Sequence, residues 1–147
     1  MSREIKFRGR RIDNGEWVYG NLMQVKYKSK TLNCIIPFVT NGSFVATGYL
    51  LKFISPCYEI DPATVGRFTG LHDKNGREIY EADWLGKDGK KKGFVVFGVW
   101  NCGCCESVFG FYLDEEHSEG WTDFRDHDMY EVLGNVHEHP HLLEVQP

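Results

Sequence analysis

Three cysteines of the sequence stand close together, and thiolates are good ligands for zinc and copper. They are Cys102, Cys104 and Cys105, and His117 or His127 could complete a set of ligands. Zinc sites usually place two residues between paired cysteines so that both thiolates converge, whereas the gaps here are one residue and none. A four-cysteine site would also need a second cluster. We therefore predict no metal site here and interpret the cluster as a turn between two strands.

A second candidate for metal binding is the histidine-rich segment near the end of the sequence. His137, His139 and His141 would share one face of a strand, and imidazoles that share a face can bind a transition metal. Pro140 interrupts the strand geometry between the second and the third histidine. We therefore predict that these histidines are splayed in a solvated terminal segment and that the protein holds no metal or cofactor.

Short motifs that mark common catalytic or phosphate-binding sites do not occur in the sequence. It has neither a G-x-S-x-G nucleophile elbow nor a glycine-rich phosphate loop. The stretch Asp73-Lys74-Asn75-Gly76 resembles the opening of a calcium loop, but it lacks the third oxygen ligand and the late glutamate of such loops. We therefore expect that the protein is not an enzyme and that this stretch forms a hairpin turn.

Basic and aromatic residues are interleaved near the N-terminus, a combination that can bind single-stranded nucleic acid through charge and stacking. The candidate nucleic-acid site consists of Lys6, Arg8, Arg10, Arg11 and Trp17. In the opposing interpretation, Trp17 belongs to the core and the cations are solvent-facing residues of edge strands, where they block unwanted pairing. The net charge of −4 favours this second interpretation, because broad nucleic-acid binding usually needs a basic surface.

Charge is distributed unevenly along the chain. Residues 1–11 carry five basic residues and one acidic residue, whereas residues 114–131 carry eight acidic residues and one basic residue. Two solvated edges of opposite sign explain this pattern most simply. A sharper hypothesis is head-to-tail self-association, in which the basic end of one copy binds the acidic end of another.

Short strands must position these candidate residues, because no segment sustains helical periodicity over three turns. Aromatic residues make up 14% of the chain and glycine is frequent, which favours strands and turns. Strand-like patterns occur at residues 4–8, 16–27, 32–39, 43–49, 58–60, 65–71, 77–80, 84–85, 94–100, 108–113 and 129–137. Asp61-Pro62 predicts one turn of helix, residues 86–93 a polar loop and residues 114–128 an acidic loop.

These elements predict an all-β fold in which short antiparallel strands form a sandwich or barrel, with at most one or two short helical turns. Residues 50–62 have the weakest pattern and could link two small units. We predict a β-hairpin-rich unit over residues 1–62 and a small SH3-like β-barrel over residues 63–147. One continuous fold is the alternative.

The cellular location follows from what the sequence lacks. No apolar run reaches the ~20 residues that a membrane span requires, and the first residues do not resemble a signal peptide. We therefore expect the reducing cytoplasm, where five cysteines, an odd number, are consistent with free thiols. Cys34 and Cys57 are isolated in the sequence, and we expect both of them to fill the core.

Segments spread over nearly the whole chain resemble the YopX family of phage and prophage proteins. They are Arg3 to Gly9, Trp17 to Gly20, Val65 to Asp83 and Glu131 to Pro140. The long third segment, which contains the Asn75-Gly76 turn, is the specific one. The family usually has glycine where Ala82 stands, and this alanine argues against a positive φ at the corner. An aliphatic residue usually stands in place of Trp84.

The resemblance implies a mostly β fold and an origin in a mobile element, and it supplies no catalytic residue. We expect a protein of unknown biochemical activity that acts in a bacterial host as a non-enzymatic, self-associating protein-interaction module. Its expected partners are a second copy of the chain and an unidentified host or phage protein, with no membrane involved. The alternative is a nucleic-acid-binding accessory protein that uses the basic N-terminal strand.

Overall fold

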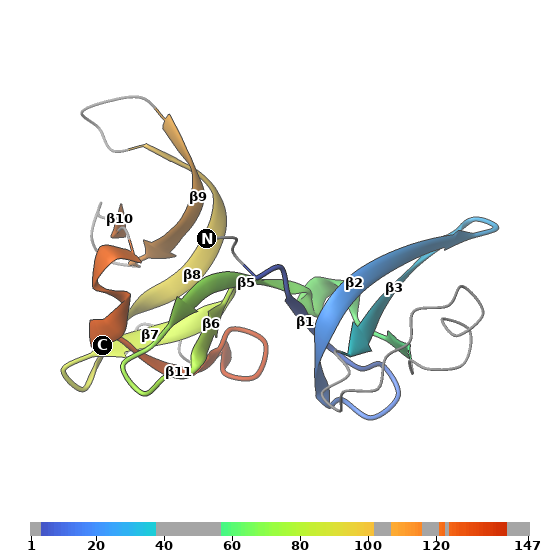
Figure 1. Ribbon diagram of the computed structural model, residues 1–147, viewed down its shortest axis with the longest axis horizontal. Helices are drawn as coiled ribbons and strands as arrows, with labels where there is room; N and C mark the ends of the chain where they lie inside the picture. Colours follow the sequence, from blue (N-terminus) through green and yellow to red (C-terminus); the bar gives the residue numbers. More distant parts are fainter. Residues whose placement is uncertain (1–3, 38–56, 102–106, 116–120, 123, 141–147) are drawn as a thin grey trace. The chain divides into compact units, whose positions relative to one another are not determined.

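The computed structural model describes residues 4–37, 57–101, 107–115, 121–122 and 124–140 (Figure 1). These residues form antiparallel strands and two short 3₁₀ segments, so the predicted all-β fold with at most two helical turns is confirmed. The chain divides into two compact units, residues 1–67 and 68–147. The predicted strand at 43–49 lies outside the described residues. Within the described ranges, no helix has the length and apolar character that a membrane crossing requires.

The first unit is an antiparallel meander that ends in a very short edge strand. Its strands are β1 (Phe7–Arg10), β2 (Trp17–Tyr27), β3 (Lys30–Pro37) and β4 (Tyr58–Glu59), in the order β4-β3-β2-β1, followed by the 3₁₀ segment η1 (Pro62–Thr64). Ile35 and Ile60 are almost completely buried. A Cβ atom on Gly9 would lie 2.3 Å from Cδ1 of Ile60, so glycine is what allows β1 to pack this closely on the core.

The strand β5 (Gly66–His72) runs from the first unit into the second. Gly66 pairs with Arg8 of β1, whereas Phe68 pairs with Tyr80 of β6 (Glu78–Tyr80). The predicted turn at Asn75-Gly76 joins β5 to β6, and Gly76 has a φ of 80°. Such a positive φ strains most residues but not glycine. Gly76 therefore determines where the chain reverses.

The second unit is built on an open antiparallel sheet with the strand order β10-β9-β8-β7-β11. Its strands are β7 (Asp83–Lys87), β8 (Lys90–Asn101), β9 (Ser107–Asp114), β10 (Trp121–Thr122) and β11 (Glu131–Asn135), and the 3₁₀ segment η2 (Phe124–Met129) precedes the last of them. The buried core comprises Ile79, Leu85, Val95, Leu113, Tyr130 and Val132. Apolar residues from β6, β7, β8, β9 and β11 thus meet in one cluster.

The second unit differs from the prediction in three details. The sequence predicted an SH3-like barrel, but the described strands leave the sheet open. The predicted loop at 86–93 is instead a two-residue turn, in which Asp88 and Gly89 have φ values of 54° and 73°. An Asp-Gly pair is a strong signal for such a turn, and the surrounding lysines obscured it. The predicted acidic loop at 114–128 contains β10 and part of η2.

Candidate functional site

A small pocket in the first unit brings together two of the predicted site residues, Arg10 and Arg11. Its volume is about 410 Å³, and Ile12, Asp61 and Pro62 complete its lining. The strand β1 ends at Arg10, and a tight turn begins at once with the hydrogen bond from the amide of Gly15 to the carbonyl of Arg11.

Hydrogen bonds of the Arg10 backbone hold the end of β1 against the segment that leads into and forms η1. The amide of Arg10 donates to Oγ1 of Thr64, and its carbonyl accepts from the amide of Asp61, each over 2.9 Å. One carboxylate oxygen of Asp61 accepts from the amide of Ala63 and caps η1, as the Asp-Pro sequence predicted. The wall of the pocket is therefore fixed by the backbone.

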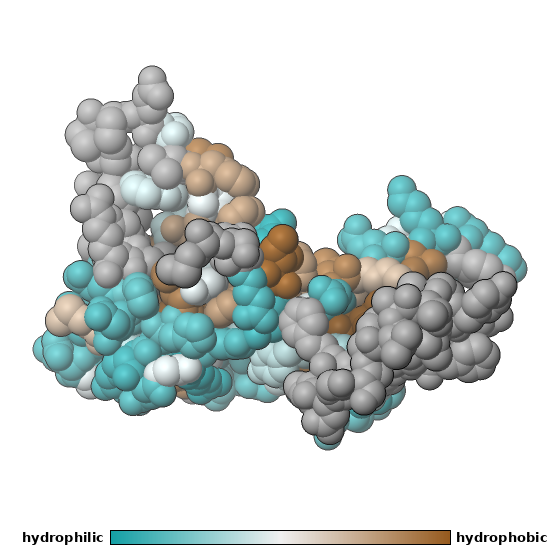
Figure 2. Space-filling model, in the orientation of Figure 1, coloured by the Kyte–Doolittle hydropathy of each residue, from teal (hydrophilic) through white to brown (hydrophobic). Residues whose placement is uncertain are grey.

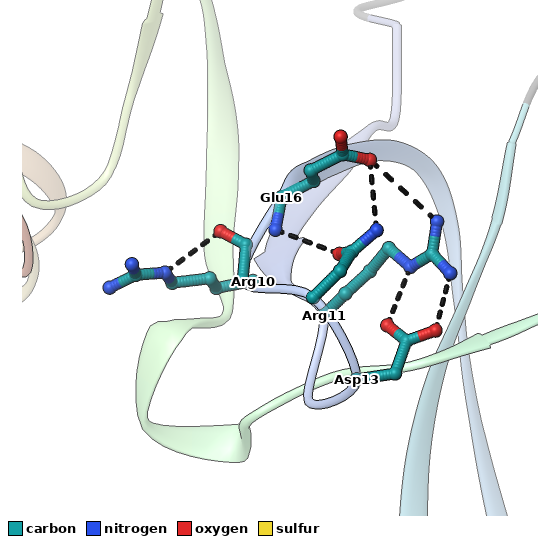
Figure 3. Close-up of polar contacts among 6 residues, drawn as sticks. Arg10, Arg11, Asp13 and Glu16 are labelled. Carbon is teal, nitrogen blue, oxygen red and sulfur yellow. Dashed lines mark hydrogen bonds and ion pairs between the residues drawn. The ribbon is translucent and has the colours of Figure 1, made fainter.

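The guanidinium of Arg11 is engaged with groups of its own unit (Figure 3). Its Nε donates to Oδ1 of Asp13 over 2.8 Å, a second nitrogen bonds the other oxygen, and Nη1 lies 3.8 Å from Oε2 of Glu16. The group also lies 4.0 Å from the ring centroid of Tyr58. The hydrogen bonds between the two side chains raise the pKa of Arg11 and lower the pKa of Asp13. Because its guanidinium is already paired, Arg11 has little capacity left to bind a ligand.

Arg10 is placed differently, and Figure 3 shows its guanidinium extending away from that of Arg11. Its Nε donates to the carbonyl of Gly15 over 2.9 Å, which orients the planar group. Its two terminal nitrogens form no hydrogen bond or ion pair with the residues that the structure describes. An oriented guanidinium with open nitrogens can bind a carboxylate or a phosphate through two parallel hydrogen bonds.

The remaining predicted residues are not gathered at this pocket. The side chain of Arg8 is buried, 4% exposed, and its guanidinium lies 5.0 Å from the ring centroid of Trp17, which is half-buried. Nζ of Lys6 lies 3.4 Å from Oε1 of Glu4, and only 12% of the Lys6 side chain is exposed. The five residues therefore fall into three groups. Arg8 is buried against the half-buried Trp17, Lys6 and Arg11 are ion-paired, and Arg10 keeps two nitrogens without a partner among the described residues.

Several of the cysteine and histidine candidates lie outside the described residues. They are Cys102, Cys104, Cys105, His117 and His141. In the described part of the chain, no three histidine, cysteine or acidic side chains are grouped so that they could hold a metal ion. Cys34 is buried, as predicted, whereas the prediction that Cys57 fills the core is wrong, because this residue is exposed.

The described histidines take part in backbone interactions. A ring nitrogen of His127 lies 2.8 Å from the carbonyl of His72, and Nδ1 of His139 accepts from the amide of Asn135. Oδ1 of Asn135 in turn accepts from the amides of His137 and Glu138. The prediction described a solvated terminal segment, but residues 135–139 form a hydrogen-bonded turn centred on this asparagine.

Asp73 has a structural role that its sequence context only partly indicated. One carboxylate oxygen accepts from the amides of Asn75 and Arg77, each over 2.9 Å, which is the predicted turn chemistry. The other oxygen accepts from the amide of Val132 over 3.0 Å, which connects the turn to β11. Burial opposes ionisation, but the three backbone hydrogen bonds outweigh it and lower the pKa of this carboxyl.

Comparisons with known proteins assign the chain to a family. The family described as YopX protein matches residues 6–144. The chain belongs to the YopX family. Among solved structures, it is similar to protein EF1440 from Enterococcus faecalis, with 22% identity, 97% of this chain and 100% of that chain covered, and a TM-score of 0.39. Among curated proteins, none matches.

The YopX resemblance of the third segment is confirmed, but one inference drawn from it is wrong. Ala82 has a φ of 72°, although alanine at a usual glycine position argued against such a value. The corner is fixed on both sides, because the amide of Ala82 donates to the carbonyl of Val95 and its carbonyl accepts from the amide of Val136. These two hydrogen bonds impose a backbone conformation that alanine adopts at an energetic cost.

Proposed function

We propose that this YopX protein is a non-enzymatic protein-interaction module that associates with a second copy of itself in the cytoplasm of a bacterial host. The family resemblance supports an origin in a phage or prophage. The observation that carries the proposal lies in the second unit, where an apolar sheet face extends from the buried core into solvent.

This surface, the β8–β9 apolar face, consists of three cross-strand pairs. The pairs are Val95 with Leu113, Phe97 with Phe111, and Val99 with Phe109. The first pair is 1% and 2% exposed and belongs to the core. The middle pair is half-buried, and the last pair is 61% and 67% exposed. The same stripe of one face therefore changes from core to surface along the hairpin.

The exposed end of the face is held in place by aromatic contacts. The ring centroid of Phe97 lies 4.9 Å from that of Phe109 and 4.7 Å from that of Phe111. Figure 2 shows tan and brown atoms where Figure 1 draws the curved β8–β9 hairpin. Because the rings are already ordered, a partner that covers them loses little side-chain entropy.

The occupant that we propose for this face is a second copy of the chain. A buried aromatic side chain covers about 150–250 Å², so Phe109, at 67% exposure, offers on the order of 100–150 Å². The exposed end of the face therefore supplies a few hundred Å², below the ~800 Å² per partner of a stable complex. Two copies related by a two-fold axis would place each apolar face on the other. Such an area supports a weak dimer that depends on protein concentration.

The test is the molar mass of the full chain in solution over a range of concentrations, measured by sedimentation velocity. The informative variant is Phe109→Ser, and the matched control is Ile5→Ser, because Ile5 is 69% exposed and lies outside the face. We expect the wild type and the control to dimerise as concentration rises, and the Phe109 variant to require at least about tenfold more protein.

Two outcomes would contradict the proposal. A wild-type protein that remains monomeric at the highest attainable concentration would exclude self-association. A dimer that survives Phe109→Ser but is lost in Ile5→Ser would place the contact elsewhere. Circular dichroism of each variant at the same concentration shows whether it retains the β fold, and a folded variant is required for either conclusion.

Binding of nucleic acid through the basic N-terminal strand is the second candidate function, and the open guanidinium of Arg10 favours it. Arg8 is buried against Trp17, so its substitution would disturb the fold together with any binding. Arg10→Ala is therefore the sharper variant. If the strand binds single-stranded DNA, this variant should bind it more weakly, and its affinity should depend less steeply on salt, by about one released counterion. Unchanged binding would refute a role for this pocket.

A further inference from the structure

Two cysteines that stand far apart in the sequence are brought together at the edge of the first unit. Cys34 lies in β3, and Cys57 directly precedes the edge strand β4. Cys34 pairs with Glu59 and Ile35 pairs with Tyr58 in the antiparallel register. Cys57 stands two residues before Glu59, so its side chain projects from the same face of the sheet as that of Cys34.

The two thiols are near enough to influence each other's ionisation, but they differ in access to solvent. Partial desolvation of the thiol raises the pKa of Cys57 to about 11, and its interaction with the Cys34 side chain adds to the shift. Cys34 is 9% exposed, whereas Cys57 is exposed. A reagent in solution therefore meets Cys57 first, with Cys34 next to it.

We propose that Cys34 and Cys57 form a reversible disulfide, by exchange with a low-molecular-weight disulfide such as oxidised glutathione, which fastens the edge strand β4 to β3. The thiolate form of Cys57, a small fraction near neutral pH because its pKa is raised, attacks one sulfur of glutathione disulfide, forms a mixed disulfide and releases one glutathione thiolate. The thiolate of Cys34 then attacks the Cys57 sulfur and releases the second glutathione. The protein loses two electrons and two protons, and the reagent is reduced to two thiols.

The register predicts a bond that forms with some strain. Diagonal neighbours on paired strands have Cα atoms about 7–8 Å apart, whereas most disulfides join Cα atoms 4.4–6.8 Å apart. Cys57 lies just outside the ladder, and β4 contains two residues, so a small shift of this edge can close the distance. A strained and exposed disulfide is readily reduced, which suits a pair that switches in a reducing cytoplasm.

The segment that such a bond would fasten also borders the pocket of the first unit. Tyr58 follows Cys57 directly and packs against the guanidinium of Arg11. The carbonyl of Glu59, the other residue of β4, accepts from the amide of Ile12, which lines the pocket. Oxidation would therefore hold both contacts in place, whereas reduction leaves them on the outermost of the described strands of this sheet.

The experiment uses the full chain, incubated with oxidised glutathione and then alkylated, digested and mapped by mass spectrometry without reduction. We expect a peptide that links Cys34 to Cys57, and its loss when reduced glutathione is added. The same link should form in a variant in which Cys102, Cys104 and Cys105 are all serine. In Cys57→Ser, Cys34 should remain alkylatable only after denaturation, because it is buried.

The wild-type measurement decides the proposal without relying on the folding of any variant. A stable glutathione adduct on Cys57 with no internal link would show that the thiols cannot reach each other and would overturn the proposal. Full alkylation of both cysteines after the incubation would overturn it as well. A disulfide that resists reduced glutathione would contradict the reversible character that the geometry requires.

Discussion

Replacing Asp73 by asparagine tests how the second unit is held together. The carboxylate accepts hydrogen bonds from the amides of Asn75, Arg77 and Val132. Asparagine keeps one oxygen, which can still serve the turn. Its amide group then faces the buried amide of Val132, and two donors cannot bond each other. The variant thus removes the connection to β11 and leaves the Asn75-Gly76 turn largely intact.

The magnitude follows from the bonds that change. A hydrogen bond to a charged group contributes about 1.5–3 kcal/mol, and a buried donor left without a partner costs about 1–3 kcal/mol. Because Asp73 is 5% exposed, solvent cannot replace the lost acceptor. We therefore expect Asp73→Asn to lower the free energy of unfolding by about 2–4 kcal/mol at pH 7. In urea this corresponds to a midpoint lower by roughly 1–2 M.

The pH dependence gives the same prediction a second test. The native pKa of Asp73 is lowered, so its contribution is present above the unfolded pKa of about 4 and is lost as pH falls through the native value. The stability difference between wild type and Asp73→Asn should therefore narrow below about pH 4. Urea unfolding followed by tryptophan fluorescence measures the difference, and hydrogen exchange at the amide of Val132 reports the lost bond directly.

The control is Asp128→Asn, the same chemical change at an exposed carboxylate, which we expect to shift stability by no more than about 0.5 kcal/mol. The reasoning fails if Asp73→Asn behaves like this control at pH 7. It also fails if the difference between wild type and Asp73→Asn is as large at pH 3 as at pH 7, or if Val132 exchanges at the wild-type rate in a destabilised variant.

Three further predictions concern single positions of the backbone and one thiol. Ala82→Gly should raise the free energy of unfolding by about 0.5–1 kcal/mol in urea titrations, because the left-handed φ of 72° strains alanine more than glycine loses in entropy; a destabilised variant would contradict this. Gly20→Ala should lower the free energy of unfolding by about 2–3 kcal/mol, because its Cβ would lie 2.0 Å from the carbonyl oxygen of Ile36. The control Gly98→Ala, which has open space around its Cβ, should change this free energy by no more than about 0.5 kcal/mol. Equal losses in the two variants would refute the steric argument. The alkylation rate of Cys57 should rise about tenfold per pH unit up to its pKa of about 11. The alkylation rate of an ordinary peptide cysteine stops rising at a lower pH, near its pKa of about 8.5. A plateau in the Cys57 rate near pH 9 would disprove the raised pKa.

The sequence indicated local features well where one residue type determines the backbone. Gly76 at the hairpin turn and Asp61 at the start of η1 have the conformations that their residue types predicted. The prediction at Ala82 was wrong because hydrogen bonds from distant segments outweigh the preference of alanine for a negative φ. Tertiary contacts decide such positions, and no local pattern encodes them.

The candidate sites depended even more on contacts between distant segments. Alternation along residues 4–8 predicted a strand there, but it could not show that Trp17 contacts the buried guanidinium of Arg8. Nor could it show that two nitrogens of Arg10 have no partner among the described residues. In the same way, Cys34 and Cys57 looked isolated because their proximity exists only through the β3–β4 register. Strand register therefore carried the information that the sequence pattern lacked.

The segment that identifies the family is occupied with holding the fold. Both carboxylate oxygens of Asp73 accept hydrogen bonds from backbone amides, and Oγ1 of Thr69 donates to the carbonyl of Ile79 inside the core. The amide of Tyr80 donates to the carboxylate of Asp83 across the corner. Side chains committed in this way are not available to recognise a ligand without loss of stability. Recognition is therefore to be sought outside this segment, where Phe109 exposes an apolar ring and Arg10 an open guanidinium.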